Sequence, residues 1–268
     1  MAEKDYAIVC DETSDLPLSF LERAGVVPLR LDDARDAAGA LGRVYRDLAG
    51  RGFPQVISIH SAALFSPVVD GAKIAAEACA DVCDVLVVDS GSASAATGML
   101  VDRAARYRHL DVPAPEAAAA LAELAAHVRL LVVPAASAPL SARRRRTPRA
   151  GLIGRAAASL RMRVTGERGL YLLARGELTQ LARGNDPAAL TGRLARAVAT
   201  VAGNEGPLVH ALAEAGDVRS LRALERALEE EGVGSSCLGT VRATPLSKEV
   251  VGAGAVAAAI APHAAYWR

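Results

Sequence analysis

Aromatic side chains are scarce in this sequence. They account for 3% of the 268 residues, and only one of them is a tryptophan. Apolar residues nevertheless make up 51% of the chain, which is enough for a sizeable core. Small and β-branched side chains must fill most of that core, and such side chains allow helices to pack closely on a sheet.

A strong charge of one sign and long apolar runs are also missing. The formal net charge is +1, and only three of the basic residues are lysines. A net charge this close to zero predicts no binding to nucleic acid. No stretch approaches the roughly 18 consecutive apolar residues of a membrane-spanning helix. The N-terminus shows no signal-peptide pattern. We therefore expect a cytoplasmic protein without membrane insertion.

The cysteines fit no zinc-binding spacing, and no cluster of histidines lies near them. We expect reduced and buried thiols, with no metal site and no cofactor. The four cysteines are Cys10, Cys79, Cys83 and Cys237.

Strand-length apolar runs alternate with helical patterns in the first half of the chain. This alternation predicts an α/β fold with a mostly parallel sheet and helices on both faces. The predicted strands are residues 5–11, 26–31, 55–61, 84–90 and 129–135. The predicted helices are residues 16–25, 37–52, 68–82, 94–110 and 115–128.

The character of the chain changes near residue 135, where a basic and turn-rich stretch begins. We therefore predict two domains, residues 1–134 and 135–268. The second begins with this basic linker and continues with a β-hairpin around Gly176 and a helix capped by Asp186 and Pro187. Further strand and helix patterns follow, so we expect a smaller α/β domain with antiparallel strands.

Polar side chains crowd the turn after the first predicted strand. Thr13, Ser14 and Asp15 are able to cap the helix that follows. Two acids, Asp11 and Asp15, would repel a phosphate at this turn. We interpret the turn as a helix cap, and a ligand site is the alternative.

The turns after the third and fourth predicted strands also carry hydroxyls, with Ser61 and Ser66 on the one and Ser90 on the other. Because the carboxyl ends of parallel strands meet at one edge of a sheet, the three turns predict a single polar rim. His60 and Ser61 point to opposite faces of a strand and form no dyad. With neutral donors and no nucleophile–base pair, the rim suits a carboxylate head group better than catalysis.

Two further patterns carry less weight. Residues 252–257 match G-x-G-x-x-A, but the chain ends before the strand and acid that a dinucleotide site needs, so we interpret them as close backbone packing. Four consecutive arginines, Arg143, Arg144, Arg145 and Arg146, are typical of a solvated loop. A docking surface for an acidic partner is the alternative for this run.

In their order and spacing, the three turns resemble the DegV family of bacterial fatty-acid-binding proteins. The family's D-S-T-S-D-L pattern is similar to residues 11–16, and its I-H-I-S-S-x-L-S-G-T pattern is similar to residues 59–68. Its V-I-D-S pattern is similar to residues 87–90, and its terminal H-x-G-P-G-A pattern to residues 250–255. The resemblance covers nearly the whole chain.

The resemblance implies two α/β domains with a fatty acid buried between them and its carboxylate held by hydroxyls. In some members a separate kinase subunit receives the fatty acid and makes an acyl phosphate. This chain departs from the family pattern at Ala62 and Ala63, which replace a pair of serines, and at Val250, which replaces a histidine. It also lacks a T-S-Q-P-S segment between Leu29 and Val56.

The expected head-group ligands are therefore Ser61, Ser66 and Ser90. The side chains expected to support the rim are those of Asp11, Thr13, Ser14 and Asp15. The rim and the resemblance together predict a non-catalytic protein that binds a fatty acid or a similar apolar carboxylate, and the resemblance to some members implies that it presents this ligand to a kinase partner. A scaffold protein that has lost lipid binding and docks a partner through its arginine run is the alternative.

Overall fold

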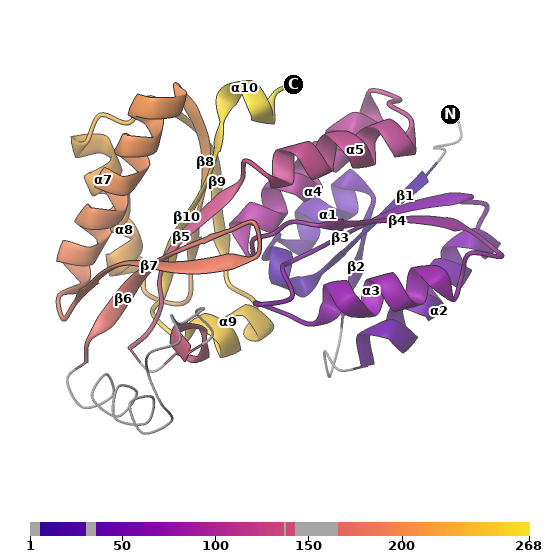
Figure 1. Ribbon diagram of the computed structural model, residues 1–268, viewed down its shortest axis with the longest axis horizontal. Coiled ribbons are helices and arrows are strands. Elements are labelled where there is room, and N and C mark those ends of the chain that lie inside the picture. The colour runs from indigo at the N-terminus through magenta and orange to yellow at the C-terminus, as the bar shows by residue number, and fades with distance from the viewer. Residues whose placement is uncertain (1–5, 31–35, 137, 143–165) are drawn as a thin grey trace.

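The computed structural model describes residues 6–30, 36–136, 138–142 and 166–268. The arginine run at 143–146 lies outside these residues. Two sheets stand next to each other, with helix α4 (Ala95–His109) packed between them (Figure 1). The expected α/β fold with parallel and antiparallel parts is confirmed.

The first sheet is parallel, with the strand order β2-β1-β3-β4. Its side chains alternate between two faces, as the strand period requires. Ala7 and Val9 pack under α2 and α3, whereas Ile8 and Cys10 pack towards α4 and α5. The strands are β1 (Tyr6–Asp11), β2 (Val26–Leu29), β3 (Gln55–His60) and β4 (Asp84–Asp89). The helices of this half, besides α4, are α1 (Leu18–Ala24), α2 (Ala37–Gly50), α3 (Val68–Glu77) and α5 (Ala114–Ala125).

The second sheet is mixed, with the strand order β7-β6-β5-β10-β8-β9. Helices α7 (Pro187–Glu205) and α8 (Val218–Glu230) cover its outer face, and its inner face packs towards α4 (Figure 1). The strands are β5 (Arg129–Val133), β6 (Arg168–Ala174), β7 (Glu177–Gly184), β8 (Leu208–Glu214), β9 (Ser235–Arg242) and β10 (Val256–Pro262). Short helices complete the chain, namely η1 (Glu12–Ser14), η3 (Pro139–Ala142), α9 (Pro245–Val251) and α10 (His263–Tyr266).

Strand β5 differs from the expectation that it extends the first, parallel sheet. It pairs antiparallel with β10 and β6 and so belongs to the second sheet. Its run of apolar residues indicates burial on both faces but carries no signal for the neighbouring strand. The division into residues 1–134 and 135–268 stays a prediction. Strand β5 precedes this boundary in the sequence but belongs to the second sheet.

Local signals in the second half are confirmed by the structure. Asp186 caps α7 through the backbone amides of Ala188 and Ala189. Gly176 forms the hairpin turn between β6 and β7 with φ +74. The cysteines depart from expectation at one position, since Cys237 is exposed on β9, whereas the other three are buried. In the described ranges, every helix is too short or too polar to span a bilayer.

Helices α2 and α3 approach each other closely at Gly71. A Cβ atom at this position would lie 2.7 Å from Ala37 Cβ and 2.9 Å from the backbone nitrogen of Ala38. Gly192, in the interior of α7, has no neighbouring atom within 4 Å of the corresponding point. Replacing each of these glycines by alanine therefore separates the effect of helix propensity on stability from the effect of packing.

We expect Gly71→Ala to lower the free energy of unfolding by roughly 1–3 kcal/mol, because overpacking outweighs the better helix propensity of alanine. Gly192→Ala should raise it by about 0.5–1 kcal/mol, because alanine gains propensity there without a clash. Guanidinium unfolding of both variants measures these changes. Equal effects of the two substitutions would contradict the close packing of α2 on α3.

Candidate functional site

A buried carboxylate, that of Asp11, stands at the carboxyl end of β1. Its side chain is 3% exposed. Oδ1 accepts a hydrogen bond of 2.8 Å from the backbone amide of Thr13 and a short one from the Thr13 hydroxyl. Oδ2 lies 2.7 Å from Nδ1 of His60. Because an ionised carboxylate only accepts hydrogen bonds, Nδ1 of His60 is the donor.

The hydroxyls of the three turns form one chain that runs towards Asp11. The Thr13 hydroxyl contacts Asp11 and, over 2.8 Å, the hydroxyl of Ser61, which in turn donates to the backbone oxygen of Thr13 over 3.4 Å. Thr97 forms hydrogen bonds with Ser61 over 3.0 Å and with Ser90 over 2.9 Å, and Ser90 also donates to the backbone oxygen of Ser92 over 3.2 Å. A continuous chain of hydroxyls therefore joins the three turns.

A second branch reaches the other face of the sheet. With Nδ1 of His60 donating to Asp11, Nε2 accepts from Ser58 over 2.7 Å. Ser58 in turn accepts from Tyr45 of α2 over 2.8 Å. His60 and Ser61 thus have different partners, and the expectation that they form no dyad is confirmed.

Ser58, His60 and Asp11 have the connectivity of a catalytic triad, which the sequence analysis did not anticipate. Ser58 and His60 have no exposed surface, and Ser58 lies under Tyr45. Neither of the two hollows described below reaches Ser58. The three side chains therefore act as a structural network. Within the described residues, no group of three or more His, Cys, Asp or Glu side chains is placed to hold a metal ion.

Asp15 joins the two sheets. It has φ 56 at the end of η1, a left-handed conformation that directs its side chain towards the second half of the chain. Oδ2 accepts a hydrogen bond of 2.5 Å from Ser94, which precedes α4. Oδ1 accepts bonds of 2.8 Å and 3.0 Å from the backbone amide and the hydroxyl of Thr244, which precedes α9. We call these three residues the Asp15 clasp.

Burial raises the pKa of Asp15 to about 6. Desolvation is the main cause, because the side chain is 2% exposed. Hydrogen bonds from Ser94, Thr244 and Ser247 favour the ionised form and oppose this rise. Asp15 therefore changes its charge closer to neutrality than an ordinary aspartate does.

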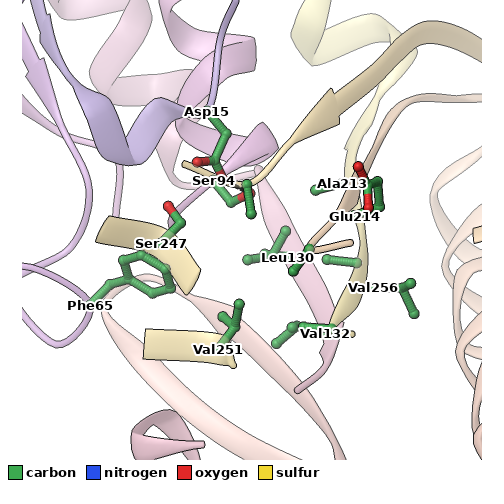
Figure 2. A pocket seen from close by; sticks show the side chains of 14 residues that line it. Asp15, Phe65, Ser94, Leu130, Val132, Ala213, Glu214, Ser247, Val251 and Val256 are labelled. Carbon is green, nitrogen blue, oxygen red and sulfur yellow. Dashed lines mark hydrogen bonds between the residues drawn. The ribbon is translucent and has the colours of Figure 1, made fainter. Parts of the chain in front are cut away.

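A small, mostly apolar cavity lies beside the Asp15 clasp, between the two sheets, with about 290 Å³ of empty space when its opening is included (Figure 2). Residues from both halves of the molecule line it. Apolar side chains contribute most of the lining, namely Phe65, Leu130, Val132, Ala213, Ala215, Ala243, Val251, Ala255, Val256 and Ala257. The polar residues that line it are Asp15, Ser94, Glu214 and Ser247.

The three serines expected to bind a head group lie outside this lining. Ser61 and Ser90 are buried in the hydroxyl chain. Ser66 differs from both, because its buried hydroxyl has no hydrogen-bond partner among the described residues. It follows directly on Phe65, which does line the cavity. An unsatisfied buried hydroxyl costs free energy unless something binds to it.

The expectation that Thr13, Ser14 or Asp15 caps the following helix is wrong, because no side chain of the described residues caps α1, and Asp11 instead caps the short helix η1. Thr13 and Ser14 are buried at the first turn, and the Ser14 hydroxyl bonds the backbone oxygen of Asp11. The sequence analysis missed two residues that complete the site, Thr97 and Thr244. Thr97 lies in the first turn of α4, where a single hydroxyl gives no signal in the sequence. Thr244 is distant from Asp15 in the sequence, yet it caps α9 and also donates a hydrogen bond to Asp15. The only signal for it in the sequence is its position before Pro245 at the start of a helix.

The fold and site together define a two-sheet α/β protein that encloses an apolar cavity behind hydroxyl-rich turns. A family model described as an uncharacterised protein of the DegV family matches residues 37–263. The match spans most of the chain, so this protein belongs to the DegV family, as the turns indicated. None of the curated proteins matches the sequence.

Solved structures share this fold over nearly their full length. A DegV family protein from Corynebacterium glutamicum aligns with a TM-score of 0.78 and 17% identity, covering 97% of this chain and 99% of that chain. A stearic acid-binding protein from Eubacterium ventriosum aligns with 0.78 and 16%, covering 98% and 99%. A DegV family protein from Thermus thermophilus, described for fatty acid binding, aligns with 0.77 and 20%, covering 96% and 99%.

We expect Asp15 to make stability fall as the pH rises from about 4 to about 7. The unfolded chain releases the Asp15 proton near the ordinary aspartate pKa of 3.8, and burial raises the pKa in the folded chain to about 6. The folded state therefore holds the extra proton in this window. Relative to Asp15→Asn, the wild-type free energy of unfolding should decrease by up to roughly 3 kcal/mol across it. Urea unfolding at both pH values tests this, and parallel pH profiles of the two proteins would contradict it.

We expect Thr97→Val to lower the free energy of unfolding by roughly 1–3 kcal/mol, because it interrupts the hydroxyl chain and leaves buried hydroxyls without a partner. Thr191→Val is the matched control, since Thr191 is a buried helical threonine that bonds only the backbone oxygen of Ala188. Its cost should be below about 1 kcal/mol. Equal losses in guanidinium unfolding would show that the hydroxyl chain adds nothing.

Proposed function

We propose that this protein binds a fatty acid or a similar apolar carboxylate between its two sheets and catalyses no reaction on it. The observation that carries the proposal is the combination of an apolar cavity with an unsatisfied buried hydroxyl, that of Ser66, beside it. The binding of stearic acid by the Eubacterium ventriosum protein, and of fatty acid by the Thermus thermophilus protein, supports the ligand class.

The acyl chain would occupy the cavity beside Leu130 and Val251. Little of the cavity's space is enclosed, so an acyl chain would have to push lining side chains aside or part the two sheets to enter it. Its two acids already have partners. Asp15 is held by its clasp, and Glu214 forms a salt bridge of 3.2 Å with Arg242 and accepts a bond from the amide of Gly216. A charged head group has no cation to pair with in this lining, so the tail is the part that fits.

The head group would lie on the Ser66 side of Phe65. The Ser66 hydroxyl can donate to a carboxylate without breaking another bond. Ser90 bonds Thr97 and the backbone oxygen of Ser92, so turning its proton towards a ligand would give up one of these bonds. Ser61 lies in the middle of the chain, where it bonds both Thr13 and Thr97. We therefore rank Ser66 ahead of Ser90 and Ser61 as the head-group donor.

In this proposal the first turn supports the site without contacting the ligand. Asp11 and Thr13 anchor the hydroxyl chain, Ser14 fastens the turn, and Asp15 holds the two sheets together. Presentation of the bound fatty acid to a kinase subunit, which the family resemblance implies, remains part of the proposal.

Ser66→Ala should weaken the binding of palmitate roughly tenfold or more, because it removes a charge-assisted hydrogen bond. In the ligand-free protein the same change should leave stability unchanged or raise it, because it deletes a buried hydroxyl that has no partner. Isothermal titration calorimetry gives the affinity, and guanidinium unfolding gives the stability.

Ser58→Ala is the control, since Ser58 is equally buried but lies on the other face of the first sheet. It should lower stability and leave the affinity for palmitate unchanged. Absence of palmitate binding by the wild-type protein, in calorimetry and in native mass spectrometry, would refute the proposed function. Binding that Ser66→Ala does not weaken would refute the placement of the head group.

A further inference from the structure

A second hollow lies on the outside of the molecule, between helices α1 and α4 and the edge strand β9. It encloses about 710 Å³ with its opening included, which is well above the 290 Å³ of the cavity. Its apolar lining includes Leu16, Phe20, Met99, Leu238 and Val241. We call it the α1–α4 groove.

The charged residues of the α1–α4 groove give it a positive balance. Arg23, Asp102 and Arg106 are the charged groups that line it. Asp102 is already engaged, because it accepts 2.7 Å and 2.5 Å bonds from Arg106 and Tyr266. Arg23 is exposed, and within the described part of the chain its guanidinium has no salt bridge. An acidic head group would therefore find one unpaired guanidinium and a second one beside it.

The edge strand of the groove is poorly suited to pairing with another strand. The register of β9 against β8 shifts between His210 and Ala211, and Gly239 has φ +135 at this irregularity. Such bulges interrupt a sheet edge and disfavour the addition of a further strand. Side chains, and not free backbone groups, are thus what the groove offers to a ligand.

The groove and the cavity are lined by neighbouring residues of the same strands. Ala211 lines the groove and Ala213 lines the cavity, two residues apart on the same face of β8. Val241 and Ala243 are related in the same way at the end of β9. The Asp15 clasp lies between the two hollows. The groove is therefore an open continuation of an apolar surface, with arginines added at its rim.

We propose that the α1–α4 groove is a second binding site, which takes a single-chain lipid with an acidic head group. The acyl chain lies along Phe20, Met99 and Leu238, and the head group meets Arg23 and Arg106. This site is separate from the cavity and does not depend on Ser66.

Trp267 provides a signal that is specific to this site. It is the only tryptophan in the chain, and the guanidinium of Arg106 lies 5.0 Å from its ring centroid. A head group that binds Arg106 should change its fluorescence. The probe is dodecanoate, kept below its micelle-forming concentration, with dodecanol as the uncharged comparison.

We expect dodecanoate to change Trp267 fluorescence with a saturable dependence on concentration. Arg23→Gln should weaken this dodecanoate response about threefold to tenfold, because it removes one charge partner at an exposed rim. The same change should leave the affinity for dodecanol, measured by calorimetry, unaltered. Absence of a saturable response in the wild type, or equal weakening for acid and alcohol, would overturn the proposal.

Leu238→Glu places a carboxylate on the β9 wall and should abolish the fluorescence response. Leu181→Glu is the matched control, because Leu181 is an exposed leucine on β7, the other edge strand of the same sheet. It should leave the response unchanged, and a full response in Leu238→Glu would overturn the groove site. Ser66→Ala distinguishes the two sites, since it should weaken palmitate binding in the cavity and leave the Trp267 response to dodecanoate intact.

Discussion

The buried carboxylate of Asp11 is the group on which the geometry of the turns depends. A carboxylate removed from water must be compensated by donors, because an isolated buried charge is very costly. Its donors come from two different segments, Thr13 of its own turn and His60 at the end of β3. Through Thr13 it also contacts the chain of hydroxyls in the turns after β3 and β4. One acid therefore aligns three loops that are distant in the sequence.

The two acids of the first turn act at different levels of the structure. Asp11 is satisfied within the first sheet and its loops, whereas Asp15 reaches across to Thr244 and Ser94 and joins the halves of the molecule. The Asp15 clasp also separates the inner cavity from the α1–α4 groove. Its raised pKa means that its charge, and with it the strength of the clasp, changes close to neutral pH.

The strands, helices and turn positions followed from the sequence because each has a local cause, such as the alternation of apolar residues or the cap at Asp186. The placement of β5 did not, because an apolar strand indicates burial without naming its neighbours. The same limit applies to the site. Asp15 was recognisable as a polar residue at a turn, but its partner Thr244 lies 229 positions away. Ser58, His60 and Asp11 form a triad-like network only because strands β1 and β3 are adjacent. The lack of a partner for Ser66 depends on the positions of all the side chains around it.

The position of β10 has a consequence for how the molecule is made. This strand, residues 256–262, is the last one in the chain, yet it lies at the centre of the second sheet between β5 and β8. During synthesis, β5, β6 and β7 emerge before the strand that connects them to β8 and β9. The parallel first sheet is complete much earlier, since its strands end at Asp89. The second sheet therefore closes only when its final strand has left the ribosome, and until then the apolar edges of β5 and β8 are open to wrong pairing.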